Sequence, residues 1–138
     1  MTVVVDASIA LKWVVPQEHT EEALALRDRW QRDSERLIAP PLFRAEVTNV
    51  IRRYVRRGHL HLIEAPEVLD VLLSSVASVE PEGLYVRALS IANDHGLSAA
   101  YDSIYLALAE FKSCDMWTAD LKFARAVQDY YKQLRTIG

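Results

Sequence analysis

The chain has little cysteine, little glycine and no excess of basic residues. Cys114 is the only cysteine, which excludes an intrachain disulfide and a cysteine metal cluster. The four glycines form neither a phosphate-binding loop nor a dinucleotide fingerprint. Because the net charge is −3, any attraction to nucleic acid has to come from local basic patches.

Long apolar runs are also absent. No segment approaches the roughly 20 apolar residues that a membrane-spanning helix needs. The N-terminus lacks the basic stretch and apolar core of a signal peptide. We therefore expect a cytoplasmic protein with no membrane partner. The 138 residues, 51% of them hydrophobic, suit one domain spanning residues 1–138.

The first clear element is the run Val3-Val4-Val5, which ends at Asp6. Branched side chains favour a strand, and the lack of alternating polar residues indicates that both of its faces are covered. Ligands of open α/β sheets bind at the carboxyl ends of strands. Asp6 is therefore a candidate ligand-binding residue, although it can equally serve as the N-cap of the next helix.

Apolar spacing and turn residues predict alternating strands and helices along the rest of the chain. The expected strands are residues 3–5, 37–39, 76–79, 115–118 and 134–137. The expected helices are residues 7–15, 20–33, 42–57, 66–75, 82–94, 98–112 and 121–131, with Ser98 a possible cap. The helix at 66–75 is apolar almost all round, which predicts burial on two sides, by the core and by another subunit. The alternation predicts a mostly parallel sheet with helices on both faces.

Four carboxylates occupy informative positions in this scheme. Asp6 and Asp120 each follow a strand, which places them at the same edge of a parallel sheet. Glu46 lies about 90° from the centre of its helix's apolar stripe, at the rim of the buried face. Asp102 falls near the first turn of a later helix. Each residue alone has an ordinary explanation as a cap, a solvated side chain or a partner of the helix dipole.

A cluster of these four acids needs a counter-charge. Two carboxylates about 4 Å apart repel by roughly 4 kcal/mol at an effective dielectric near 20. Four cannot all remain ionised together without a cation, and oxygen-only ligands suit Mg²⁺ or Mn²⁺. The implied chemistry is metal-assisted attack of water on a phosphodiester.

Four motifs resemble those of the PIN domain family. They are Val-Val-Asp-Ala-Ser at residues 4–8, Arg-Ala-Glu-Val at 44–47, Tyr-Asp-Ser-Ile-Tyr-Leu-Ala-Leu-Ala at 101–109 and Trp-Thr-Ala-Asp-Leu-Lys-Phe at 117–123. The opening segment at 6–13 is especially similar to VapC-type toxins of toxin–antitoxin pairs. The resemblance implies a three-layer α/β/α fold with a parallel sheet of about five strands. It also implies an endoribonuclease dependent on Mg²⁺ or Mn²⁺ that leaves a 5′-phosphate and a 3′-hydroxyl.

The resemblance also assigns roles to individual residues. The positions that match the family's acidic metal ligands and catalytic residues are Asp6, Glu46, Asp102 and Asp120. Thr118 matches its hydroxyl position before the last acid, and Ser8 matches a small polar residue near the first. Family members are commonly homodimers, and a small antitoxin commonly inhibits them by placing an arginine in the acidic pocket.

Further residues are candidates for supporting roles beside RNA. Asn49 lies one turn beyond Glu46 and can orient it by a hydrogen bond. Arg53 on the same helix, and Lys12 shortly after Asp6, can hold backbone phosphates, although both can equally be surface residues. Trp13 is the tryptophan best placed for stacking on a base, whereas a core role is the simpler explanation for all three tryptophans.

Two other functions remain open. An aspartate-nucleophile phosphatase also places its Asp at a strand end, but the haloacid dehalogenase type wants a second Asp where Ser8 stands. A non-catalytic interaction domain can keep the same fold and acids for stability.

Overall fold

The five strands form one parallel sheet at the centre of the molecule. The computed structural model describes all residues, 1–138. Its elements are β1 (Thr2–Val5), α1 (Ala7–Ala10), η1 (Leu11–Trp13), α2 (Thr20–Arg32), β2 (Arg36–Ala39), α3 (Leu42–Arg56), α4 (Ala65–Ser75), β3 (Ala77–Ser78), α5 (Leu84–Asp94), α6 (Tyr101–Lys112), β4 (Asp115–Thr118), α7 (Leu121–Val127) and β5 (Leu134–Thr136). The strand order is β3-β2-β1-β4-β5 and every pairing is parallel.

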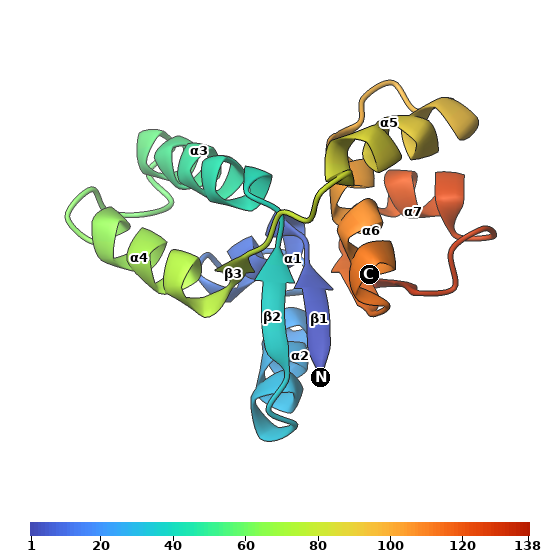
Figure 1. The fold of residues 1–138 in the computed structure, drawn as a ribbon. Helices are drawn as coiled ribbons and strands as arrows, with labels where there is room; N and C mark the ends of the chain where they lie inside the picture. Colours follow the sequence, from blue (N-terminus) through green and yellow to red (C-terminus); the bar gives the residue numbers. More distant parts are fainter.

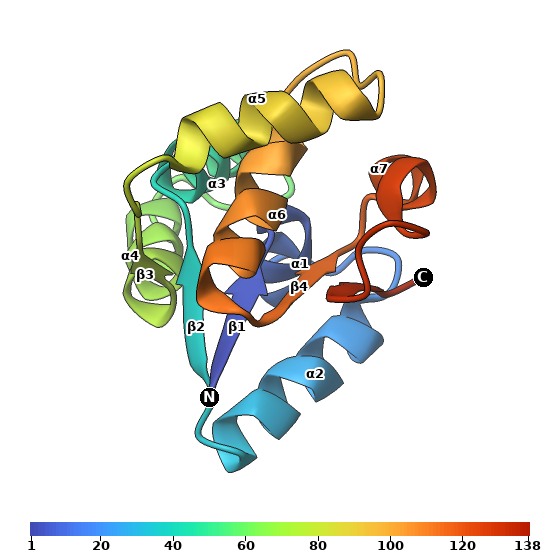
Figure 2. The same ribbon diagram turned by 45° about the vertical axis from the view of Figure 1, so that its right-hand side comes forward.

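Helices cover both faces of this sheet (Figures 1 and 2). The chain moves outward from β1 through β2 to β3, and then crosses back over the sheet to β4 and β5. Because such crossovers are right-handed, the reversal moves the later helices to the opposite face. Helix α6 packs on β1 and β4, and α5 packs against α6. The predicted three-layer α/β/α fold is therefore confirmed.

The reversal of strand order takes place at β1, the central strand. Val3 lies opposite Leu37 of β2 and Asp115 of β4, which fixes the register on both sides. Val3, Val4 and Val5 are all buried, as the unbroken apolar run predicts. The crevice beyond β1 and β4 is thus a topological switch point, where open α/β sheets bind ligands.

Several predicted boundaries need correction. The helix expected at 7–15 is a short α1 followed by the 3₁₀ turn η1. The helix expected from residue 98 begins at Tyr101, and Ser98 makes no cap; the residue at the N-cap position is Ala100. Helix α7 ends at Val127 rather than at residue 131. Residues 98–100 thus form a loop instead of a helical turn, and Ser98 and Ala99 line a cavity beside the acids.

Helix α4 buries one of its two apolar sides against the core, and its burial by another subunit stays a prediction. Leu72 is fully buried, but Val71 is 56% exposed, so only one side of the helix packs on the rest of the chain. Helix α3 ends as expected before Gly58, which has the positive φ of +75° that glycine adopts without strain. No helix has the length and the apolar character needed to cross a membrane.

Candidate active site

Two neighbouring strands deliver the first and last acids to the same edge of the sheet. β1 pairs with β4, and the pairing continues past β1 because the backbone N–H of Asp6 donates to the carbonyl of Trp117 at 3.1 Å. Asp120 follows β4 by two residues and is the N-cap of α7. The expectation that Asp6 and Asp120 share one edge is therefore confirmed.

The Asp6 carboxylate is held by two hydroxyl groups from different parts of the chain. Its Oδ2 accepts from Ser8 Oγ at 2.8 Å and from Thr118 Oγ1 at 2.7 Å. Asp6 occupies the predicted N-cap position of α1, but its side chain makes no cap hydrogen bond there. The helix begins at this position, but the carboxylate turns toward β4 because the hydroxyls there satisfy it.

Ser8 and Thr118 also tie the two acidic strand ends together. Ser8 Oγ accepts from the backbone N–H of Ala119 at 3.0 Å, and Thr118 Oγ1 accepts from that of Asp120 at 3.0 Å. Each hydroxyl therefore donates to the Asp6 carboxylate and accepts from a backbone N–H of the turn between β4 and α7. This double use fixes the distance between Asp6 and the backbone of Asp120, which agrees with the supporting roles expected for Ser8 and Thr118.

Asp120 caps a helix while facing the other acids. Its Oδ1 accepts from the backbone N–H of Phe123 at 3.0 Å, the N-cap bond that its position predicts. The cap restrains the rotamer of Asp120, and its charge contributes to raising the pKa of both Asp6 and Asp102. The cap and a ligand role are thus compatible in this residue.

Asp102 carries a strongly shifted pKa. It lies in the first turn of α6. Partial burial, followed by the charges of Asp6, Asp120 and Glu46, raises the pKa of Asp102 to about 7. Burial also raises the pKa of Asp6 above its ordinary value, although the two hydroxyl donors oppose this shift. The four carboxylates are therefore near enough for their charges to influence one another's pKa.

Glu46 is oriented by a residue that we did not predict. The Tyr105 hydroxyl donates to Glu46 Oε1, and Tyr105 is completely buried. Burial raises the pKa of Glu46, while the Tyr105 hydrogen bond lowers it. Burial and the charges of Asp6 and Glu46 raise the pKa of Tyr105, so this phenol remains protonated. The signal in the sequence is the i, i+3 spacing from Asp102, which puts both residues on one face of α6.

The other expected neighbours lie elsewhere. Asn49 is exposed and makes no hydrogen bond to Glu46, whose Oε1 accepts from Tyr105. Lys12 is only 9% exposed, and its Nζ donates to the carbonyl of Glu18 at 2.8 Å, which argues against the expected contact with RNA. Arg53 is exposed on α3 and has no ion pair, so it remains a free cation.

A cavity of about 460 Å³ opens beside two of the acids. It is lined by His95, Gly96, Leu97, Ser98, Ala99, Asp102, Asp120, Lys122, Phe123 and Ala126. Lys122 is exposed and follows Asp120 by two residues. The cavity therefore combines acidic, basic and apolar groups in a volume typical of small-ligand sites.

The donor set fits a hard divalent cation. Every candidate ligand is a carboxylate oxygen, which suits Mg²⁺ or Mn²⁺ better than softer metals. No three histidine, cysteine, aspartate or glutamate side chains are gathered closely enough to hold an ion by themselves. Magnesium usually binds through one or two carboxylates and keeps several waters, so this open arrangement suits a hydrated ion rather than a closed cage.

The match to a family model accounts for this combination of fold and acids. The model of the PIN domain matches residues 3–128. This chain belongs to the PIN domain family. The PIN domain match covers all four acids and both hydroxyls.

Individual relatives of this PIN domain are similar over most of their length. Ribonuclease VapC3 from Pyrobaculum aerophilum is 31% identical over 127 residues, which cover 90% of this chain and 93% of the relative. Ribonuclease VapC9 from Mycobacterium tuberculosis is 30% identical over 123 residues, 88% of either chain. Among solved structures, VapBC2 from Rickettsia felis, bound to a DNA fragment from its promoter, gives a TM-score of 0.71. That match has 13% identity and covers 99% of this chain and 98% of the other, so it supports the fold.

Proposed function

We propose that this PIN domain is an endoribonuclease dependent on Mg²⁺ or Mn²⁺, and that it is the toxin of a toxin–antitoxin pair. The observation that carries the proposal is the electrostatic coupling of Asp6, Glu46, Asp102 and Asp120 near the switch point of the sheet. The names of two relatives at 30–31% identity, both ribonucleases, support the choice of RNA as substrate.

In this proposal each side chain has a separate task. Asp6, Asp102 and Asp120 would hold a hydrated ion partly through its water molecules, and Glu46 would complete the site. A divalent ion supplies charge compensation at the phosphate and acidifies water. Ser8 and Thr118 hold the Asp6 carboxylate in place, and Tyr105 holds Glu46. The oxygen of water bonds to phosphorus as the bond to the 3′-oxygen breaks, which leaves a 5′-phosphate and a 3′-hydroxyl.

RNA also needs basic groups near so acidic a site. Lys122 lines the cavity beside Asp102 and Asp120, where it can pair with a backbone phosphate. Arg53 supplies a second unpaired cation on α3. These two residues take the place of Lys12, whose ammonium group is bound within the chain.

The test is cleavage of total RNA by the purified protein with Mg²⁺ or Mn²⁺. We expect wild type to cleave and Asp6→Asn to lose activity by at least about 100-fold, because a neutral amide cannot balance a cation as a carboxylate does. Asp70→Asn is the matched control, since Asp70 is exposed on α4 and lies outside the site. Equal cleavage by wild type and Asp6→Asn, or none with either metal, would contradict the proposal. Trapping of a phosphate mimic on Asp6 would instead indicate a phosphatase.

The proposed partners are an antitoxin protein and a second copy of the chain. The relatives' names and the solved VapBC2 complex support an antitoxin. Exposed apolar side chains on α5, Val86 at 76% and Leu89 at 56%, are available for pairing with a second copy. Light scattering of the purified chain tests the dimer, and loss of RNA cleavage on co-purification with the antitoxin tests the inhibitor.

A further inference from the structure

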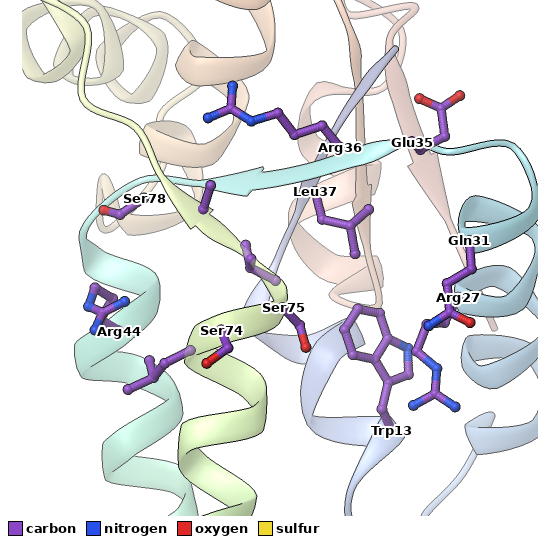
Figure 3. A pocket seen from close by; sticks show the side chains of 13 residues that line it. Trp13, Arg27, Gln31, Glu35, Arg36, Leu37, Arg44, Ser74, Ser75 and Ser78 are labelled. Carbon is purple, nitrogen blue, oxygen red and sulfur yellow. The ribbon is translucent and has the colours of Figure 1, made fainter.

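A second cavity lies on the side of the sheet toward α2 and α4, away from the four acids. It has a volume of about 530 Å³ and is bordered by α2, β2, β3 and the C-terminal end of α4 (Figure 3). None of Asp6, Glu46, Asp102 and Asp120 lines it. Its volume is in the range of small-ligand sites, and nothing in the proposed nuclease mechanism uses it.

Trp13 forms a preset aromatic wall of this cavity. Its indole Nε1 donates to the carbonyl of Ala23 at 3.0 Å, and its ring packs edge to face on Trp30 at 6.4 Å. The ring is therefore held before any ligand arrives, and yet it is only partly buried. Figure 3 shows the indole between Ser75 on one side and Arg27 on the other, below Leu37. A planar ligand can stack here with little further loss of conformational entropy.

Arg27 adds a positive charge that the protein compensates with one long ion pair only. Its guanidinium lies 5.9 Å from the centre of the Trp13 ring, and 37% of its side chain is exposed. Its only acidic neighbour is Asp28 at 4.0 Å, and its buried Nε has no hydrogen-bond partner. The glutamate of this cavity, Glu35, has the N-terminal amino group 4.0 Å away. Arg27 therefore has charge available for an anion.

The opposite end of the cavity is also basic. Arg44 lies beside Ser74 and Ser78 in Figure 3, and it takes part in no ion pair. Arg36 points to the other side of β2 from Leu37 and contributes little. An aromatic platform with cations on both sides is the chemistry that binds single-stranded nucleotides through stacking and phosphate contacts.

The path of the chain brings this cavity within reach of the acids. Helix α1 starts directly after Asp6, and η1 ends at Trp13. Four α-helical and three 3₁₀ residues rise by about 12 Å in total. This rise, at most about 12 Å, is a distance that a few nucleotides of RNA can span.

We propose that this cavity is a nucleotide-binding subsite in which a base stacks on Trp13 and a phosphate pairs with Arg27. Its role in holding substrate RNA rests on the proposed ribonuclease function, whereas nucleotide binding itself does not. The ligand is either a nucleotide within an RNA strand or a free nucleotide, because both present a base and a phosphate. The two sources differ in how many phosphates they offer to Arg27 and Arg44.

Binding without cleavage is the appropriate test. Fluorescence anisotropy with a labelled ten-nucleotide RNA in EDTA measures affinity while the metal is absent, and 5′-AMP as a competitor probes the free nucleotide. We expect Trp13→Leu to weaken binding about 10-fold, in the range found for loss of one stacked base. We expect Arg27→Gln to weaken it several-fold and to reduce the slope of log K against log salt by about 0.7. Arg32→Gln is the matched control, because it removes the same charge from an exposed position of α2 outside the cavity.

A second variant guards against misfolding of Trp13→Leu. Ser74 is exposed at the cavity wall, so Ser74→Tyr fills the space without touching the core and is expected to block binding. Absence of binding by wild type, or equal affinity of wild type, Arg27→Gln, Ser74→Tyr and the control, overturns the inference. If 5′-AMP competes with the labelled RNA, the subsite binds free nucleotides. If 5′-AMP does not compete, the subsite binds a nucleotide within an RNA strand. A wild type that binds through these residues and cleaves nothing would contradict only the ribonuclease proposal.

Discussion

Replacement of Asp102 by asparagine is expected to stabilise the metal-free protein at alkaline pH. Burial and three neighbouring carboxylates raise the pKa of Asp102 from its ordinary 3.8 to about 7. The folded protein therefore holds this proton more tightly than the unfolded chain does. Between these two pKa values the native state binds more protons, so the stability contributed by this group falls as pH rises through the window. Asparagine stays neutral at all these pH values, so the stability of Asp102→Asn does not fall through this group.

The magnitude follows from the size of the shift. Each pKa unit corresponds to about 1.36 kcal/mol, which gives a ceiling of about 4 kcal/mol at pH 8. Asp102 is only partly buried, and water at the cavity screens its charge, so we expect about half of this, about 2 kcal/mol. At pH 5 nearly all of the native Asp102 is protonated, so less than half of the stability difference between Asp102→Asn and wild type should remain.

The assay is urea unfolding followed by circular dichroism at pH 5 and pH 8 in EDTA. Wild type, Asp102→Asn and the exposed control Asp70→Asn are compared, and the control is expected to change stability by less than about 0.5 kcal/mol. A stabilisation that is equal at both pH values, or a variant less stable than wild type at pH 8, would refute the electrostatic reasoning.

Addition of Mg²⁺ in the same assay tests the ligand role of Asp102. A ligand that binds only the folded state stabilises it by RT ln(1 + [L]/Kd), so Mg²⁺ should raise the stability of wild type at pH 8. Asp102→Asn should gain less, because one proposed ligand and one charge are missing. If Mg²⁺ raises the free energy of unfolding equally in both proteins, Asp102 is not a ligand of the ion.

Two further predictions concern the groups that hold the acids. Tyr105→Phe removes the donor to Glu46, so the pKa of Glu46 should rise further and RNA cleavage should fall about 10-fold, with a stability loss of about 1–2 kcal/mol by urea unfolding. Unchanged cleavage would make that hydrogen bond purely structural. Thr118→Val keeps the shape but loses the hydroxyl shared by Asp6 and the Asp120 backbone. We expect the free energy of unfolding to fall by about 1–3 kcal/mol and calorimetry to show weaker Mg²⁺ binding. A variant that binds Mg²⁺ as tightly as wild type would count against the positioning role of Thr118.

Most of the fold was predictable from local patterns of apolar and polar residues. The unbroken valine run indicated a strand covered on both faces, and helical spacing located α2 and α3 to within a residue or so. These features depend on side-chain periodicity over a few neighbouring residues. Helix ends were less predictable, since the start of α6 at Tyr101 depends on how the preceding loop packs and not on a capping residue in the sequence.

The sequence by itself determined that Asp6 and Asp120 follow strands, and that a parallel sheet brings such residues to one edge. The sequence also contains the family motifs that predict Glu46 and Asp102 as site residues. Tertiary structure alone decided what satisfies these groups: Thr118 reaches Asp6 across 112 residues, Tyr105 reaches Glu46 across 59, and Lys12 turns to Glu18. The physical reason is that a buried carboxylate takes whichever donor packing places within hydrogen-bond distance, and that choice depends on contacts far apart in the chain.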